Sequence, residues 1–305
     1  MTGDLGTRLL ALGRRLGPDV LAGTIALLRE RHAGRIEDAV TVTRDISYSP
    51  HERQRLDAFG ARTGEARPVL VFIHGGGFVQ GERSIAGTPF HDNVACWAVR
   101  HGMVAINATY RLAPAFTWPS GVEDLRALFA WVVEHASAIG GNPRRIFFYG
   151  TSAGASHIAN FLAHAPESAG LAGVVLGSGV YEIAGREPAA STLAYYGENA
   201  ETYPTMSPAD AAARSSVPML LYATEGDPAE FQWQTGNFVA RIESVSGRAP
   251  THLLLQGHNH YSPALSLGSD LPENPLATEI LAFVGATERP SASAVDAPID
   301  SIVVR

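Results

Sequence analysis

Cysteine and long apolar runs are the two things that this 305-residue chain most conspicuously lacks. The single cysteine, Cys96, excludes a framework of intramolecular disulfides. Its neighbours in NVACWAV favour a small side chain in the core of a helix. No apolar run approaches the roughly 18 residues that a membrane-spanning helix needs. The sequence therefore predicts a protein with neither a disulfide scaffold nor a membrane span.

Positive charge is also scarce. The chain has 23 Lys and Arg against 30 Asp and Glu, for a formal net charge of −7. Because nucleic-acid-binding proteins concentrate basic residues on one face, this balance argues against a nucleic-acid partner. The apolar stretches near the N-terminus are interrupted by Arg14-Arg15 and Pro18-Asp19, which makes a secretory signal a poor match. We therefore expect a cytoplasmic protein.

Hydrophobic residues, in contrast, are plentiful at 46%, and they are arranged in short runs. From residue 69 on, these runs alternate with helical segments, and each is apolar without interruption. Unbroken apolar runs are typical of strands buried on both faces of a parallel sheet. Two earlier segments, 39–48 and 53–59, alternate partly and predict antiparallel strands. The fold class is therefore α/β, with buried strands expected near residues 70–74, 103–110, 145–150, 173–178, 218–223 and 251–256.

Three regions fall outside this alternation. Residues 4–33 predict two short helices divided at Gly17-Pro18, and 180–212 is rich in loops. Both are candidates for a cap over the carboxyl edge of the sheet. The tail is expected to be loosely attached. We therefore expect a helical cap segment at 1–38, an α/β domain at 39–286 to which 180–212 adds cap structure, and a tail at 287–305.

The stretch YGTSAGAS contains the pattern G-x-S-x-G at residues 150–154, with Ser152 at its centre. The strand RIFFY precedes it and a helix-like segment follows. A sharp turn between strand and helix would expose Ser152 at the edge of the sheet, and the small residues around it would let both elements pack closely. The helix N-terminus favours negative charge beside the serine. In this context the pattern predicts a nucleophile, with a helix-capping serine as the structural alternative.

A serine nucleophile needs a base, and the base needs an acid that orients it. Both are expected downstream, at the ends of later strands. The segment PMLLYATEGDPAEF offers Glu225, Asp227 and Glu230, of which Asp227 is favoured. The run D-P-A-E also predicts that Asp227 caps the following helix, and the two roles are compatible because they can use different oxygens.

Candidate bases follow in LLLQGHNHYSP, where His258 and His260 both come after the last strong strand. Either could instead be a polar loop residue. The H-x-H pair also suggests a zinc or iron site, but no third ligand is near in sequence, so a metallohydrolase is a remote alternative. Apart from His74, the remaining histidines are expected on the surface or on helices.

The segment HGGGF, residues 74–78, follows a core strand and contains three consecutive glycines. Acyl transfer forms an oxyanion that needs N–H donors already in place. Backbone amides can approach such an oxygen closely where no Cβ is in the way. The glycines are therefore candidates for an oxyanion site, to which the N–H of Ala153 would add a donor. A plain flexible loop is the competing interpretation.

Together these motifs resemble the hormone-sensitive-lipase-like esterases of the α/β-hydrolase superfamily. They occur in the order of that family and extend over roughly residues 40–285. Thr151 and Ala155 depart from the family, which commonly has Asp and Gly there, and the histidine is followed by Tyr-Ser rather than Gly-Phe. The matching segments are HGGGF at 74–78, TYRLAP at 109–114, GTSAG at 150–154, Asp227-Pro228 and HNHYSP at 258–263.

The resemblance implies an α/β-hydrolase fold, with a mostly parallel central sheet flanked by helices and a small helical N-terminal cap. It implies a serine carboxylic-ester hydrolase of the EC 3.1.1 type that acts on short to medium acyl esters through an acyl-enzyme. No cofactor and no metal are expected. The implied roles are nucleophile for Ser152, base for His260 in preference to His258, orienting acid for Asp227, oxyanion donors for Gly76, Gly77 and Ala153, and a brace of the glycine loop for His74.

Two alternatives stay open within the same fold. An amidase or formamidase would use the same triad. A small-molecule receptor without catalysis is a route that some family members have taken after losing the catalytic histidine. The sequence also leaves a homodimer open. Four aromatic residues near the motifs are expected in the pocket or in the core: Phe78, Tyr181, Phe231 and Tyr261.

Overall fold

The computed structural model describes residues 3–32, 40–60, 66–183, 188–271 and 274–287. The expected boundary of the cap segment at residue 38 and all but the first residue of the expected tail lie outside these ranges. Among the described residues, no helix combines the length and the apolar character needed to cross a membrane.

Within the described ranges, eight strands form one sheet, and its order is β1-β2-β4-β3-β5-β6-β7-β8. Strand β2 runs antiparallel to both of its neighbours, whereas all other adjacent pairs are parallel. This arrangement confirms the predicted α/β fold with antiparallel strands at its start. The strands are β1 (Thr41–Ser47), β2 (Arg55–Gly60), β3 (Arg67–Ile73), β4 (Val104–Ala108), β5 (Gly141–Thr151), β6 (Gly173–Gly177), β7 (Met219–Gly226) and β8 (Thr251–Asn259).

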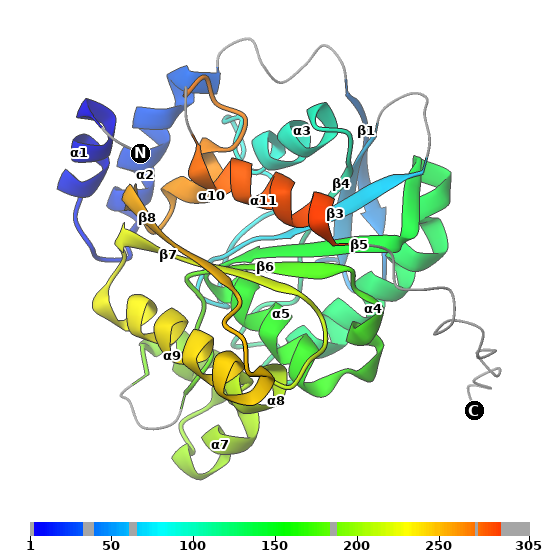
Figure 1. Cartoon of the computed structure of the whole chain (residues 1–305), viewed down its shortest axis with the longest axis vertical. Coiled ribbons are helices and arrows are strands. Elements are labelled where there is room, and N and C mark those ends of the chain that lie inside the picture. Colours follow the sequence, from blue (N-terminus) through cyan, green and yellow to red (C-terminus); the bar gives the residue numbers. More distant parts are fainter. Residues whose placement is uncertain (1–2, 33–39, 61–65, 184–187, 272–273, 288–305) are drawn as a thin grey trace.

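Helices follow most of the strands, and the sheet lies between two layers of them (Figure 1). The described ranges also contain four short 3₁₀ helices: η1 (Glu30–His32), η2 (Ala136–Ile139), η3 (Pro166–Gly170) and η4 (Ala200–Thr202). The α-helices are α1 (Asp4–Ala11), α2 (Pro18–Arg29), α3 (Asp92–Arg100), α4 (Ser120–His135), α5 (Ala153–His164), α6 (Ala190–Tyr196), α7 (Tyr203–Met206), α8 (Ala209–Ala212), α9 (Ala229–Ser246), α10 (Ser262–Ser266) and α11 (Pro275–Ala286).

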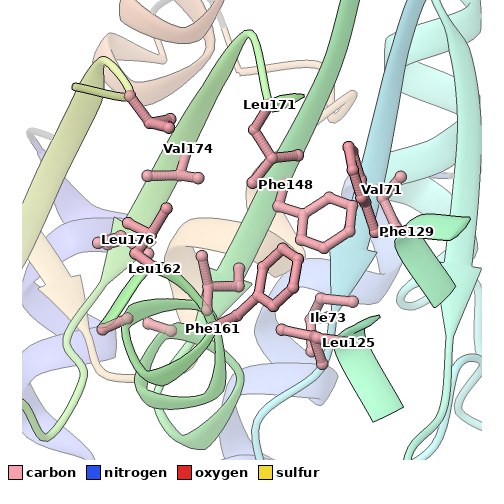
Figure 2. Packing of buried hydrophobic residues seen from close by; sticks show 14 of the residues in the cluster. Val71, Ile73, Leu125, Phe129, Phe148, Phe161, Leu162, Leu171, Val174 and Leu176 are labelled. Atoms are coloured by element: carbon pink, nitrogen blue, oxygen red, sulfur yellow. The ribbon is translucent and has the colours of Figure 1, made fainter. Parts of the chain in front are cut away.

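Each face of the sheet has its own core, because successive side chains of a strand point to opposite faces. In β3, Val71 and Ile73 pack on one face with α4, α5, α8 and α9. Leu70 and Phe72 pack on the other face with α3, α10 and α11. Figure 2 shows the first core, where Phe148 of β5 meets aromatic rings from α4 and α5. Burial on both faces explains why the strands are apolar without interruption.

The two N-terminal helices lie beside the carboxyl ends of β7 and β8, next to α10 (Figure 1). Helix α2 begins at Pro18, as the Gly17-Pro18 pair predicts. A Cβ on Gly226, the last residue of β7, would lie 3.0 Å from Leu10 Cδ2. The first part of the chain therefore packs where the expected acid and base are carried.

Candidate active site

Ser152 occupies a strained turn between β5 and α5. Its φ of 55° and ψ of −124° lie outside the regions that L-residues readily adopt, which costs about 1–3 kcal/mol. The glycines of the motif permit the turn. A Cβ on Gly150 would lie 2.6 Å from the nitrogen of Ala155, and one on Gly154 would lie 2.7 Å from the carbonyl oxygen of His74. The serine lies just beyond the carboxyl end of β5, as its motif predicts.

Asp227, directly after β7, is fully buried and accepts three hydrogen bonds. Its Oδ2 receives the N–H of Thr224 at 2.7 Å and the hydroxyl of Ser178 at 2.6 Å. Its Oδ1 receives Nδ1–H of His260 at 2.6 Å. Burial alone would raise the pKa of Asp227, but these hydrogen bonds outweigh it and hold the pKa below its usual value. Asp227 is therefore a carboxylate aimed at the His260 ring.

The other acidic candidates have structural partners. Glu225 accepts the N–H of Gly257 at 2.8 Å, and Glu230 accepts from the side chain of Gln234. The prediction that Asp227 caps α9 is wrong: Pro228 is the N-cap residue, and no side chain caps the helix there. The carboxylate of Asp227 instead accepts hydrogen bonds from Thr224, Ser178 and His260.

The structure separates the two candidate bases. His260 contacts Asp227, and its Nε2 is buried without a hydrogen-bond partner in the described chain. His258 lies on Ser262 instead, with 2.9 Å between its Nδ1 and the hydroxyl oxygen. Burial lowers the pKa of His258 to about 3. Only His260 is therefore oriented by the acid.

Ser152 is linked to the Asp227–His260 pair through the end of β6. The N–H of Ser152 donates to the carbonyl of Gly177 at 2.7 Å, and the next residue, Ser178, binds Asp227. Among the described residues, no hydrogen bond joins Ser152 Oγ to His260 Nε2. Such contacts are often long in unliganded enzymes and tighten with substrate. The three residues share one edge of the sheet, and His260 Nε2 is available as an acceptor.

Sequence reasoning missed Ser178. This buried residue has a φ of 46° and follows β6. No motif surrounds it, and its importance comes from the pairing of β6 with β7, which brings its hydroxyl to Asp227. Ser178 could have been identified only from the register in which β6 pairs with β7.

At each of the three positions after His74, a different physical reason explains why the residue is glycine. A Cβ on Gly75 would lie 3.0 Å from Ser152 Cβ, so that residue passes directly by the nucleophile. Gly76 has a φ of 126°, and a Cβ there would collide with the carbonyl oxygen of Gln80. Gly77 has a φ of 60°. Every one of these positions disfavours a side chain.

The glycine loop is a fixed turn, in which the carbonyl of Gly76 accepts the N–H groups of Val79 and Gln80. This geometry disfavours the flexible-loop interpretation. The hydrogen bonds among the described residues leave the N–H groups of Gly76, Gly77 and Ala153 unused. Unused donors beside a nucleophile are what an oxyanion site needs.

His74 anchors the start of this loop. Its Nδ1–H donates to the carbonyl of Gly75 at 2.6 Å, and its ring stacks on Tyr110 with 4.4 Å between centroids. The hydroxyl of Tyr110 donates to the carbonyl of His74 at 3.0 Å. Complete burial lowers the pKa of His74 to about 3, so the ring is neutral at ordinary pH.

Helix α6, from the loop-rich region, packs against this loop. Phe78 stacks on Tyr195 with ring centroids 4.9 Å apart. The hydroxyl of Tyr195 accepts the N–H of Gly121, and that of Tyr196 accepts from Asn160 of α5. Stacking and hydrogen bonds thus hold α6 against both the glycine loop and the helix that follows Ser152.

The other three aromatic candidates have separate environments. Tyr181 is buried in the core against Phe238. Phe231 and Tyr261 both pack on the ring of His260, at centroid distances of 4.7 and 5.5 Å. The last two therefore contact the candidate base, whereas Tyr181 has a packing role.

Acid is expected to destabilise the fold through three buried histidines. Burial lowers the pKa of His74, His157 and His258 to about 3, whereas an unfolded histidine titrates near 6.5. Between these values the unfolded chain binds more protons, so their stabilisation is complete above about pH 6.5 and is lost as the pH falls toward 3. Each should contribute a slope of up to about 1.4 kcal/mol per pH unit near pH 4.5.

Urea unfolding between pH 7 and pH 4.5 measures this slope. His157→Leu should lower this slope by the contribution of about one proton taken up on unfolding, because neither ring nitrogen of His157 has a hydrogen-bond partner among the described residues. His252→Leu, which makes the same substitution at an exposed histidine, is the matched control. An unaltered slope in His157→Leu would refute this explanation.

Among the described residues, no group of three or more His, Cys, Asp or Glu could hold a metal ion. The H-x-H pair therefore gains no third ligand in that part of the chain.

Comparison with known proteins agrees with this geometry. A family model for the alpha/beta hydrolase fold matches residues 70–260. Carboxylesterase NlhH of Mycobacterium tuberculosis is 42% identical over 88 residues, which cover 28% of this chain and 26% of that protein. The probable carboxylic ester hydrolase LipM of the same species is 28% identical over 266 residues, covering 82% of this chain and 58% of LipM. The matches thus span only part of these relatives' length.

Solved structures share the fold at low identity. A hyperthermophilic esterase from the archaeon Pyrobaculum calidifontis superposes with a TM-score of 0.69 at 21% identity, over 93% of this chain and 97% of that one. A bacterial heroin esterase gives 0.68 at 21% identity, over 93% and 96% of the two chains. With the family model covering residues 70–260, the chain belongs to the α/β-hydrolase fold and, within it, to the hormone-sensitive-lipase-like esterase family.

Proposed function

We propose that this protein is a serine carboxylic-ester hydrolase of the EC 3.1.1 type that forms an acyl-enzyme on Ser152. The observation that carries the proposal is the buried Asp227–His260 pair, with 2.6 Å between Oδ1 and Nδ1, at the sheet edge where Ser152 sits in a strained turn. A serine, a histidine and an orienting carboxylate together are the minimal set for nucleophilic acyl transfer. The receptor alternative loses support, since the histidine is present and bound to the acid.

In the first half-reaction, Ser152 Oγ attacks the acyl carbon of the ester while His260 Nε2 takes the hydroxyl proton. Asp227 accepts Nδ1–H, which fixes the ring tautomer and stabilises the imidazolium. The carbonyl oxygen becomes an oxyanion, and the unused N–H groups of Gly76, Gly77 and Ala153 are the proposed donors to it. His74 braces the loop that carries two of them.

Collapse of the tetrahedral intermediate breaks the bond between the acyl carbon and the alcohol oxygen. His260 returns its proton to the leaving alcohol. In the second half-reaction His260 takes a proton from water, which attacks the acyl-enzyme, and the same proton then returns to Ser152 Oγ as the acid leaves. Every proton transfer in these steps uses a group of this chain, so the proposal needs no cofactor.

A small-molecule ester is the proposed substrate, and the preference for short to medium acyl groups rests on the family resemblance. The cytoplasmic location, the homodimer and the lack of a nucleic-acid partner stay predictions from the sequence.

Matched ester and amide substrates test this function. The purified protein should hydrolyse p-nitrophenyl butyrate at least about tenfold faster, in kcat/KM, than the p-nitroanilide of the same acid, since p-nitroaniline is a poorer leaving group than p-nitrophenolate. Faster cleavage of the anilide would favour the amidase alternative. If the protein hydrolyses neither of these substrates, and also fails to hydrolyse acetate and hexanoate esters, the proposal is contradicted. Turnover that a chelator abolishes would favour a metallohydrolase.

A further inference from the structure

The residues on both sides of His260 are hydrogen-bonded to the N-terminal helical segment. Asn259, which precedes the base, donates from Nδ2 to the hydroxyl of Thr24 on α2 at 2.8 Å, and more weakly to the carbonyl of Leu9 on α1 at 3.4 Å. Tyr261, which follows it, accepts the N–H of Gly17 at 3.1 Å through its hydroxyl. These contacts join positions more than two hundred residues apart in sequence. Residues 259–261 are therefore held against the N-terminal helical segment on both sides of His260.

Asn259 also fixes the backbone around the base. Its Oδ1 accepts the N–H groups of Tyr261 at 3.2 Å and Ser262 at 3.1 Å, so one buried amide spans the peptide units that follow His260. Because an amide group is planar, a partner that orients Nδ2 also orients Oδ1. The position of Thr24 is thereby transmitted to the backbone that carries the imidazole.

Thr24 is suited to this task. It is completely buried, and its hydroxyl donates to the carbonyl of Val20 at 2.7 Å. With its one proton used in this way, the oxygen presents a lone pair to Asn259 Nδ2. Serine could supply the same oxygen, whereas valine has nearly the same shape and cannot accept a hydrogen bond.

The same helical segment reaches the acid. Leu10 lies against Gly226, the residue before Asp227, as the 3.0 Å separation from a Cβ on that glycine indicates. Gly226 pairs with Asn259 across β7 and β8. Helices α1 and α2 thus contact both strand ends that carry the Asp227–His260 pair (Figure 1).

We propose that the N-terminal helices position the catalytic base through the hydrogen bonds of Asn259 and Tyr261, of which the two shorter ones, Asn259–Thr24 and Tyr261–Gly17, dominate. Thr24, Asn259 and Tyr261 are positioning residues for His260. The proposal rests on the function proposed above, in which His260 takes the proton of Ser152. When either hydrogen bond is lost, the backbone of the loop gains freedom and Nε2 is aligned with Ser152 for less of the time. Proton transfer then slows, whereas binding of the ester is little affected.

Thr24→Val removes the first hydrogen bond with little change in packing. We expect kcat on p-nitrophenyl butyrate to fall by about tenfold with KM within about twofold of wild type, because lost alignment acts on the chemical step. The rate of labelling of Ser152 by a fluorophosphonate probe should fall in parallel. Thr24→Ser, which restores the hydroxyl, should recover most of the activity.

Thr7→Val is the matched control, since Thr7 lies on α1 and, in the described part of the chain, its exposed hydroxyl donates to the carbonyl of Gly3. It should keep the wild-type kcat. All rates are measured well below the melting temperature of each variant, so a merely structural role of Thr24 would lower that temperature and leave kcat unchanged. A folded Thr24→Val protein with wild-type kcat would overturn the proposal.

Tyr261→Phe removes the second hydrogen bond, keeps the ring on His260, and decides the matter if Thr24→Val fails to fold. We expect it to lower kcat several-fold with KM nearly unchanged. Wild-type kcat in this variant would overturn the proposal. If the wild-type protein itself hydrolyses no ester, it is the proposed function that fails, whereas an active wild type with unchanged variants refutes only the positioning role.

Discussion

Ser152→Ala is expected to lower kcat on a chromogenic acetate or butyrate ester by about 10⁵-fold or more. Alanine keeps the Cβ and removes the oxygen that attacks the ester in the proposed mechanism. The oxyanion donors and the binding surface stay, so a small residual rate above that in water is expected.

The same variant should fold normally. The hydrogen bonds made by Ser152 in the described structure use its backbone: its N–H donates to Gly177 and its carbonyl accepts from Ser156. Its melting temperature should therefore lie within a few degrees of wild type, and its circular dichroism spectrum should match. Turnover above about a tenth of the wild-type rate in this folded variant would exclude Ser152 as the nucleophile.

His260→Ala should have the second largest effect, a loss of about 10⁴-fold or more in kcat. It removes the group that takes the proton from Ser152 and leaves the buried carboxylate of Asp227 without its partner at 2.6 Å. Some stability should be lost as well, because an unpaired buried carboxylate is costly. Activity is therefore measured where the variant is folded.

His258→Asn is the matched comparison for the base. Its buried ring lies on Ser262 and, with a pKa lowered to about 3, is neutral in the working range. Asparagine can keep a hydrogen bond to Ser262. We expect kcat within about tenfold of wild type, together with lower stability. If His258→Asn were inactive and His260→Ala active, the two histidines would have to exchange roles.

The fold could be predicted, and the candidate site residues could be proposed, because each signal is local. Strands buried on both faces are uninterrupted apolar runs, and Ser152, Asp227 and His260 all lie at or just beyond the carboxyl end of such a run. Since parallel strands end at the same edge of a sheet, these three positions meet there. The order of the strands is thus sufficient to bring together residues that are far apart in the sequence.

Capping of α9 by Asp227 could not be judged locally. The D-P-A-E pattern favours a cap, but the carboxylate has stronger partners that the sequence does not place beside it. Ser178 is 49 residues away from Asp227, and Thr24 is 235 residues away from Asn259. No periodicity or motif connects such positions, so the groups that orient the acid and the base emerge from the tertiary structure.

The burial of His157 is a further feature that the sequence did not indicate. It lies on helix α5, as its sequence context suggests, but it is fully buried among Phe78, Tyr110 and Tyr195. Amphipathic periodicity separates exposed from buried positions only when a helix has a solvent face. The first ten residues of α5 are all buried, so periodicity gave no information there.

Covalent capture of the nucleophile tests the central claim most directly. The protein is incubated with a fluorophosphonate probe, and the adduct is located by peptide mass spectrometry. One stoichiometric adduct on Ser152 is expected, with loss of ester hydrolysis in proportion to labelling, and with no adduct in Ser152→Ala. Absence of an adduct on Ser152 in an esterase-active preparation, or full activity after Ser152 is labelled, would contradict the acyl-enzyme mechanism proposed for this site.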